Sequence, residues 1–294
     1  MVPTLSCGVS DRMIRARSGR SASTKGIKNV KILYCGDIVG RAGRNVVTRH
    51  IKDLRQKYDL DVVIVNGENA SHGFGLTPSN AQELLDNGVD GITTGNHIWQ
   101  QKEIYPFLDS SKRIVRPLNY PDSLPGKGAQ VLEINGKKLL MVQVLGRLFM
   151  PPINSIIEPL DNLLKFYTLG KNIDAIVVDI HGEATSEKLA LGFYLDGKVS
   201  LVAGTHTHVP TADARILPNK TGYITDVGMC GDFDSVLGFE IETPMERLAE
   251  KLTVQNRLTP ANGKTLTIWG IMVETDASGL CQNVIQIKET FENN

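Results

Sequence analysis

Three of the six histidines in this 294-residue chain lie directly after two apolar segments. His181 follows residues 176–180, and His206 and His208 follow residues 201–204. Imidazole is among the commonest metal ligands, and side chains two positions apart in an extended chain point to the same side. The spacing therefore predicts that the His206 and His208 rings are directed at one metal centre. A polar loop with incidental histidines is the alternative at this point.

Other potential ligands occupy the same relative place after three earlier apolar segments. These segments, residues 30–35, 61–65 and 91–94, are expected to be strands, and each ends in a polar loop that contains glycine. Ligands bind at the carboxyl ends of the strands in open α/β sheets, so five such loops predict one shared site. The three earlier loops contribute the following candidates: Asp37, Glu68, Asn69, Asn96 and His97.

The types of these candidates restrict the metal. No cysteine is among them, which argues against a structural zinc site built from thiolates. Nitrogen and oxygen ligands suit Mn, Fe or Zn. Even without His97, the seven remaining candidates exceed the needs of one ion and suit two. A bridging carboxylate would hold the ions ~3.5–4 Å apart, as in-line phosphoryl displacement requires.

The elements that position these loops alternate between helix and apolar strand. That alternation predicts an α/β fold with layers of mixed β-sheet flanked by helices. Asn135-Gly136 lies between two alternating segments and is a strong hairpin signal. We expect helices at residues 43–58, 77–87, 158–169, 186–195 and 243–252, and hairpins at residues 129–145, 212–225 and 265–287.

Composition excludes several classes of protein. Lys+Arg and Asp+Glu both number 32, so net charge gives no case for nucleic acid or an anionic membrane. No apolar run approaches the ~18 residues of a membrane span, and the four scattered cysteines predict reduced thiols and a cytoplasmic location. Residues 1–28 are basic and lack periodicity; we expect a disordered extension, with organelle targeting as the alternative, before a single domain at 29–294.

Several of these motifs together resemble the signature of calcineurin-like metallophosphoesterases. They are Gly36-Asp37, Gly95-Asn96-His97 and Thr205-His206-Thr207-His208. More narrowly, residues 36–41, 66–70, 179–183 and 226–229 resemble the bacterial YmdB family. The resemblance runs from about residue 29 to the C-terminus. It implies a metallophosphoesterase-like sandwich that hydrolyses 2′,3′-cyclic nucleotides with two divalent ions, Fe or Mn foremost and Zn as the alternative.

The resemblance also implies a division of the ligands between the two ions. One ion would take Asp37, Glu68, Asn69 and His208, and the other Glu68, Asn96, His181 and His206. Two positions depart from the wider superfamily: Val39 stands where a histidine is usual, and Glu68 stands where the bridging aspartate is usual. The YmdB family shares both departures, and Asn69 would replace the missing histidine.

Two divalent ions would lower the pKa of a bridging water towards ~7, so that hydroxide attacks phosphorus at neutral pH. His97 is then the expected general acid for the departing ribose oxygen. A phosphomonoesterase or RNA-end phosphatase with the same site stays open. So does a metal-dependent nucleotide-binding regulator of RNA turnover without strong activity. Partners in RNA turnover, a homo-oligomer, and the role of residues 226–238 as site lining or subunit contact also stay open.

Overall fold

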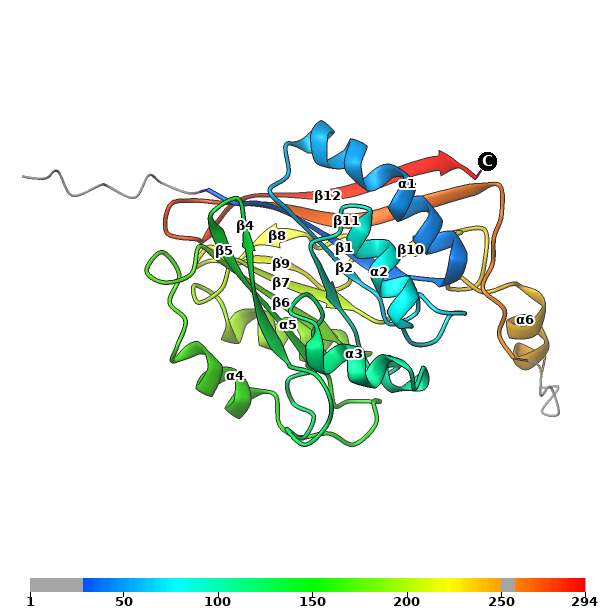
Figure 1. The fold of residues 1–294 in the computed structure, drawn as a ribbon, viewed down its shortest axis with the longest axis horizontal. Helices are drawn as coiled ribbons and strands as arrows, with labels where there is room; N and C mark the ends of the chain where they lie inside the picture. Colours follow the sequence, from blue (N-terminus) through cyan, green and yellow to red (C-terminus); the bar gives the residue numbers. More distant parts are fainter. Residues whose placement is uncertain (1–28, 250–256, 294) are drawn as a thin grey trace, which may run out of the picture.

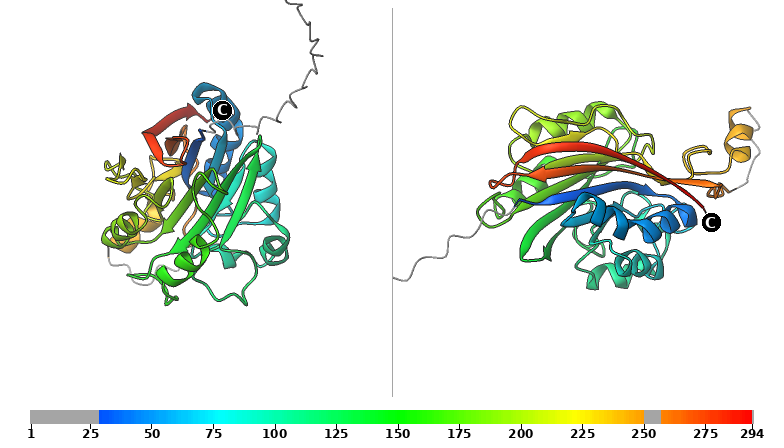
Figure 2. Two further views of the ribbon diagram at one scale, coloured as in Figure 1. Left: turned by 90° about the vertical axis from the view of Figure 1, so that its left-hand side faces the viewer. Right: turned by 90° about the horizontal axis from the view of Figure 1, so that it is seen from above.

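The fold was analysed in a computed structural model, which describes residues 29–249 and 257–293. Two six-stranded sheets pack face to face, and helices cover their outer faces (Figures 1 and 2). This arrangement confirms the predicted α/β sandwich of mixed sheets. The expectation for residues 1–28 concerns a segment outside the described residues.

The first sheet has the strand order β12-β11-β10-β1-β2-β3. Strands β1, β2, β3 and β10 run parallel, whereas β11 and β12 form the predicted antiparallel hairpin. The bounds of its strands and of the helices that follow them are β1 (Lys31–Ile38), α1 (Gly40–Tyr58), β2 (Val62–Asn66), α2 (Pro78–Asp86), β3 (Gly91–Thr93), the 3₁₀ helix η1 (Ile98–Gln100), α3 (Ile104–Ser110), β10 (Met229–Gly231), β11 (Thr265–Thr275) and β12 (Cys281–Glu292).

The second sheet has the order β4-β5-β6-β7-β9-β8. Strands β5, β6, β7 and β9 are parallel, and β4 and β8 pair antiparallel at the two edges. Its elements, with α6 beyond them, are β4 (Ala129–Ile134), β5 (Lys137–Leu145), α4 (Ile157–Leu164), β6 (Ala175–His181), α5 (Thr185–Tyr194), β7 (Leu201–Thr205), β8 (Arg215–Ile216), β9 (Gly222–Ile224) and α6 (Glu242–Leu248).

Most predicted elements are present; the largest shifts are at α4, which ends at Leu164 and not at residue 169, and at β12, which extends to Glu292 and not to residue 287. Helix α2 begins as expected: Thr77 caps it by accepting a hydrogen bond from the Asn80 amide, and Pro78 occupies the first turn. Three short elements, α3, η1 and β10, were not predicted from the sequence. The predicted helix at 243–252 is observed as α6, and its expected end falls among residues outside the described ranges.

Apolar strands explain why the layers form. Strands β2, β6 and β7 are buried along their whole length, as expected where both sheet faces are covered. Between the sheets lies a core that includes Ile64, Met141 and Val177, and separate apolar clusters fill the spaces beneath the helices. In the part of the chain that the structure describes, no helix is long and apolar enough to span a bilayer.

Candidate metal centre

The side chains predicted to hold one ion converge on the His181 ring. His181 Nε2 lies 2.9 Å from Glu68 Oε1, 3.2 Å from Asn96 Oδ1 and 3.1 Å from His206 Nδ1. Ligand atoms of Glu68, His181 and His206 all lie within 4.8 Å of one another. The first sheet supplies Glu68 and Asn96 and the second supplies the two histidines, so the cluster bridges the sheets at their common edge.

The residues predicted to hold the other ion lie beside this cluster. Asp37 Oδ1 is 3.9 Å from His181 Nδ1 and 4.0 Å from His208 Nε2. Asp37 Oδ1 and Asn69 Oδ1 are buried and have no hydrogen-bond donor among the described residues. Buried oxygens are almost always paired, and carboxylate and amide oxygens are acceptors that a cation satisfies. The donor set therefore fits divalent metal ions.

Burial and mutual attraction set the charges within the cluster. Burial raises the pKa of Asp37 to about 7. Burial opposes charge on Glu68 and His181 as well, but their contact dominates: it lowers the pKa of Glu68 to about 2 and, with Asp37, raises that of His181 to about 9. A metal ligand must be an unprotonated imidazole, so a cation bound at His181 Nε2 would displace a proton.

A chain of hydrogen bonds orients the His181 ring. The Thr205 hydroxyl donates to Asp179 Oδ1 at 2.7 Å, and its oxygen lies 2.9 Å from His181 Nδ1. Because the hydroxyl proton is used on Asp179, Thr205 accepts from His181 Nδ1–H, which leaves Nε2 as the ligand atom. Tyr34 also donates to Asp179, at 2.6 Å, and burial raises the pKa of this carboxyl.

The loop after β7 holds two histidines in an unusual backbone conformation. His206 has φ +100° and His208 has φ +63°, a region that side chains other than glycine rarely occupy. Asp37 accepts a hydrogen bond from the His206 amide at 3.1 Å, and His208 Nδ1 donates to the Leu237 carbonyl at 2.8 Å. These bonds hold the strained loop in place.

Beneath the same loop lies a buried ion pair that the sequence did not reveal. Lys188 Nζ lies 2.8 Å from Asp226 Oδ2 and 2.7 Å from the Thr205 carbonyl oxygen, and both charged side chains are 1% exposed. Asp226 in turn accepts from the amides of Thr207 and Gly228. Asp226 thus supports the histidine loop, and Val236 and Leu237, later in the same segment, line the cavity at this site.

Gly95 has no room for a side chain. A Cβ at this position would collide with the Glu68 carboxylate and would lie 2.6 Å from His181 Nε2. The glycine therefore allows β3 to end directly against the ligand cluster.

Comparison with known proteins gives the family. The model of a family described as YmdB-like protein matches residues 33–287. The chain belongs to the YmdB-like family. A Bacillus subtilis member, a 2′,3′-cyclic-nucleotide 2′-phosphodiesterase, is 47% identical over 247 residues, which cover 84% of this chain and 92% of the relative.

Two solved structures extend this comparison of the YmdB-like chain. A Thermus thermophilus protein titled hypothetical superposes with TM-score 0.80 at 41% identity and covers 90% of this chain and 99% of its own. A Mycoplasma pneumoniae protein titled a novel phosphatase gives 0.81 at 34% identity, with 90% and 95% covered. The relatives with named activities act on phosphoric esters, which confirms the predicted enzyme class, and the family implies divalent metal ions.

In this YmdB-like chain, His97 borders the cluster. Its amide donates to Glu68 Oε2 at 3.1 Å, and Gln100 Nε2 lies 2.7 Å from its Nδ1. Because an amide nitrogen only donates, the neutral His97 ring carries its proton on Nε2. Burial lowers the pKa of His97.

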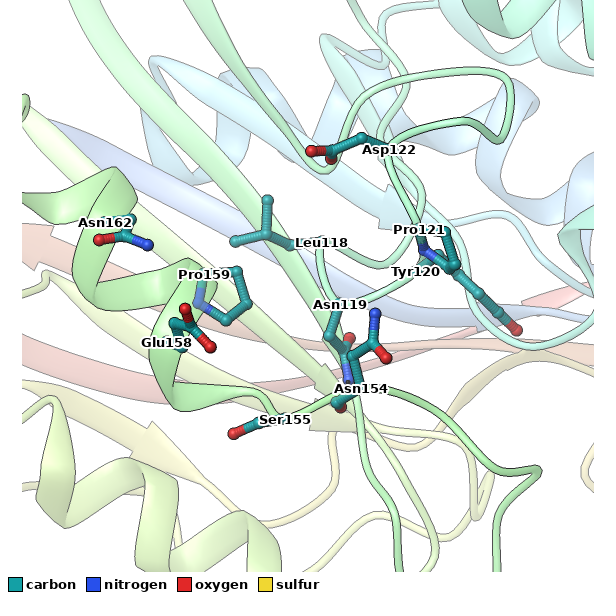
Figure 3. A pocket seen from close by; sticks show the side chains of 10 residues that line it. All are labelled: Leu118, Asn119, Tyr120, Pro121, Asp122, Asn154, Ser155, Glu158, Pro159 and Asn162. Carbon is teal, nitrogen blue, oxygen red and sulfur yellow. Dashed lines mark hydrogen bonds between the residues drawn. The ribbon is translucent and has the colours of Figure 1, made fainter.

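The cluster opens into a cavity of about 560 Å³. Its lining includes Glu68, Asn69, His97, His206 and His208, and the other lining side chains are apolar apart from Arg247. A separate cavity of about 380 Å³, between Leu118 and Asn162, is lined by none of the predicted ligands (Figure 3). Of these two cavities, the one of about 560 Å³ is therefore the one that adjoins the candidate ligands.

Proposed function

We propose that this protein is a phosphodiesterase that uses two divalent metal ions to hydrolyse 2′,3′-cyclic nucleotides to nucleoside monophosphates. The observation that carries the proposal is the convergence of nitrogen and oxygen ligands from both sheets, with buried acceptors on Asp37 and Asn69 that lack donors. The named activity of the Bacillus subtilis relative supports the choice of substrate.

Each ion has its own set of ligands in this proposal. Asp37, Asn69 and His208 would hold one ion, Asn96, His181 and His206 would hold the other, and Glu68 would serve both. Bound divalent ions supply a water of lowered pKa and neutralise charge on the phosphate oxygens. Iron or manganese is our first choice and zinc the alternative, since the ligands are nitrogen and oxygen.

His97 is the proposed proton donor to the departing ribose oxygen. It lines the cavity beside Glu68, and it would donate from its protonated, imidazolium form. The edge of the His97 ring packs against Phe74, with centroids 5.1 Å apart and ring planes at 77°, which fixes the orientation of the imidazole.

The test is a substrate panel on the purified, metal-loaded protein. We expect 2′,3′-cyclic AMP to be hydrolysed, and 3′,5′-cyclic AMP and p-nitrophenyl phosphate to be poorer substrates. His97→Gln should keep both metals by elemental analysis yet lose roughly 10²–10⁴-fold in kcat, as expected for a general acid. Loss of a metal from this variant would show that His97 is a ligand instead.

A phosphomonoesterase is the second candidate, because the Mycoplasma pneumoniae relative is titled a phosphatase. Faster turnover of a nucleoside monophosphate than of any cyclic phosphodiester would favour it. Bound metal without turnover of any ester would favour a binding role in place of both.

A further inference from the structure

The cavity beside the metal centre has two walls of different chemistry. In the proposed reaction the cyclic phosphate lies against the polar wall, which contains predicted ligands and His97. The rest of the lining, apart from Arg247, is apolar and forms a second wall, which adjoins the first where Phe74 packs against His97. Its members come from the loop after β2 and from the segment around α6: Phe74, Val236, Leu237, Phe239, Pro244, Leu248 and Leu258.

Two aromatic rings form the base of this apolar wall. The Phe74 and Phe239 rings are stacked, with centroids 5.4 Å apart and planes at 24°. Phe239 is buried in a small cluster with Val39 and Met229, so its position is fixed. Gly73 makes room for it, because a Cβ there would lie 2.6 Å from the ring. A rigid aromatic surface thus faces the same cavity as the metal ligands.

Aliphatic side chains extend this surface to the cavity mouth. Val236, Leu237 and Leu248 are 37%, 47% and 81% exposed, respectively. Scattered exposed apolar residues need no explanation, but these line one cavity that also holds a reactive centre. Covering them with a flat apolar group would remove that surface from water.

The size of the cavity fits a whole nucleotide better than a phosphate alone. About 560 Å³ lies within the roughly 300–1,000 Å³ typical of small-molecule sites. We infer that the wall formed by Phe74, Phe239 and Leu248 binds the nucleobase of a 2′,3′-cyclic nucleotide whose phosphate lies at the metal centre. This inference rests on the proposed function and adds the part of the substrate that the site recognises.

The chemistry of the wall also sets its selectivity. Every base has an apolar face for stacking, whereas bases are told apart by polar groups on their edges. Among the described residues on this wall, Arg247 is the only charged one, and it already has an interaction of its own. The wall therefore holds a base without reading its edge, and the cyclic phosphates of all four bases are substrates with kcat/KM values within about tenfold of one another.

The test compares 2′,3′-cyclic AMP with the base-free 2,3-cyclic phosphate of methyl riboside. For Phe239→Ala we expect the ratio of the two kcat/KM values to fall roughly 5- to 150-fold, the equivalent of ~1–3 kcal/mol per stacked base. Leu248→Ala should lower the ratio about 3- to 10-fold through lost apolar contact. Phe166→Ala is the control, because Phe166 is 73% exposed and lies in the segment that precedes β6, whose other end carries the predicted ligand His181.

The outcomes separate this inference from the function beneath it. Leu248 is exposed, so its variant tests the wall even if Phe239→Ala does not fold. Equal losses on both substrates, or an unchanged ratio in both variants, would overturn the base site and leave the cyclic phosphodiesterase intact. A wild-type enzyme that hydrolyses neither substrate would overturn the proposed function and this inference together. A preference for one base well above tenfold would overturn the claim that the edge is not read.

Discussion

Replacing Lys188 by methionine tests whether the buried pair with Asp226 supports the metal centre. Two unit charges 2.8 Å apart attract by about 6 kcal/mol at an effective dielectric constant of ~20, and the cost of desolvating both ions offsets part of this. Removing one partner of a buried pair typically costs about 3–5 kcal/mol, because the other charge stays buried. The hydrogen bond from Lys188 to the Thr205 carbonyl is lost as well.

The measurement is urea unfolding with a chelator present, which separates this cost from that of metal loss. We expect the free energy of unfolding of Lys188→Met to fall by about 3–5 kcal/mol, equivalent to a Tm lower by roughly 6–20 °C. Lys171→Met is the matched control, because Lys171 is exposed and should change stability by less than ~0.5 kcal/mol.

A double variant with Asp226→Asn completes the test. With both charges removed, the loss should be smaller than the sum of the two single losses by more than about 1 kcal/mol. Elemental analysis should also show fewer bound metal ions in Lys188→Met, since the loop with His206 and His208 loses its support. A loss of stability below ~1 kcal/mol, or losses that simply add, would refute the reasoning.

Three further predictions follow from single residues. Gly95→Ala should abolish metal binding in elemental analysis while the far-UV spectrum is kept, because its Cβ would enter the space between Glu68 and His181. Thr205→Val should weaken metal affinity about 10- to 100-fold in competition with a chelator, whereas Thr205→Ser should restore it, because the hydroxyl orients the His181 ring. Burial opposes charge on Asp213, but hydrogen bonds from Thr211 and Thr225 outweigh it and lower its pKa. A carboxyl whose pKa is lower in the folded than in the unfolded state stabilises the fold at pH values above its unfolded-state pKa. This contribution is lost as the pH falls through its folded-state pKa. Asp213→Asn should therefore reduce the fall in Tm at acidic pH.

The positions of the strand-end ligands could be predicted from the sequence because the pattern is local. A buried strand that ends in glycine and polar residues places its last side chains at one edge of a sheet, and Asp37, Asn96 and His181 follow that rule. The order of the motifs along the chain then indicated one family, and the family implied the fold. The same rule predicted that these loops share one site, whereas the division of the ligands between two ions came only from the resemblance.

The supporting residues could not be predicted in the same way. Lys188 lies on an amphipathic helix, where a lysine is expected to be solvated, yet it is fully buried. Its burial follows from Asp226, 38 positions further along the chain, and no local pattern links the two. Asp179 precedes His181 by two residues in a buried strand. Because an unpaired charge would be costly there, its position indicates a residue that pairs with its neighbours, and this was the one supporting role that the sequence could have suggested.

The ligand cluster joins two layers that also meet through apolar packing and through polar contacts such as the hydrogen bond from Tyr34 to Asp179. One sheet carries Asp37, Glu68 and Asn96, and the other carries His181, His206 and His208. Cations held between these residues would therefore cross-link the two sheets. Binding energy that favours the folded chain adds to its stability. Removing the ions should then speed amide hydrogen exchange at the ligand-bearing strand ends of both sheets together. Metal loss would therefore lower both the activity and the local stability of the protein.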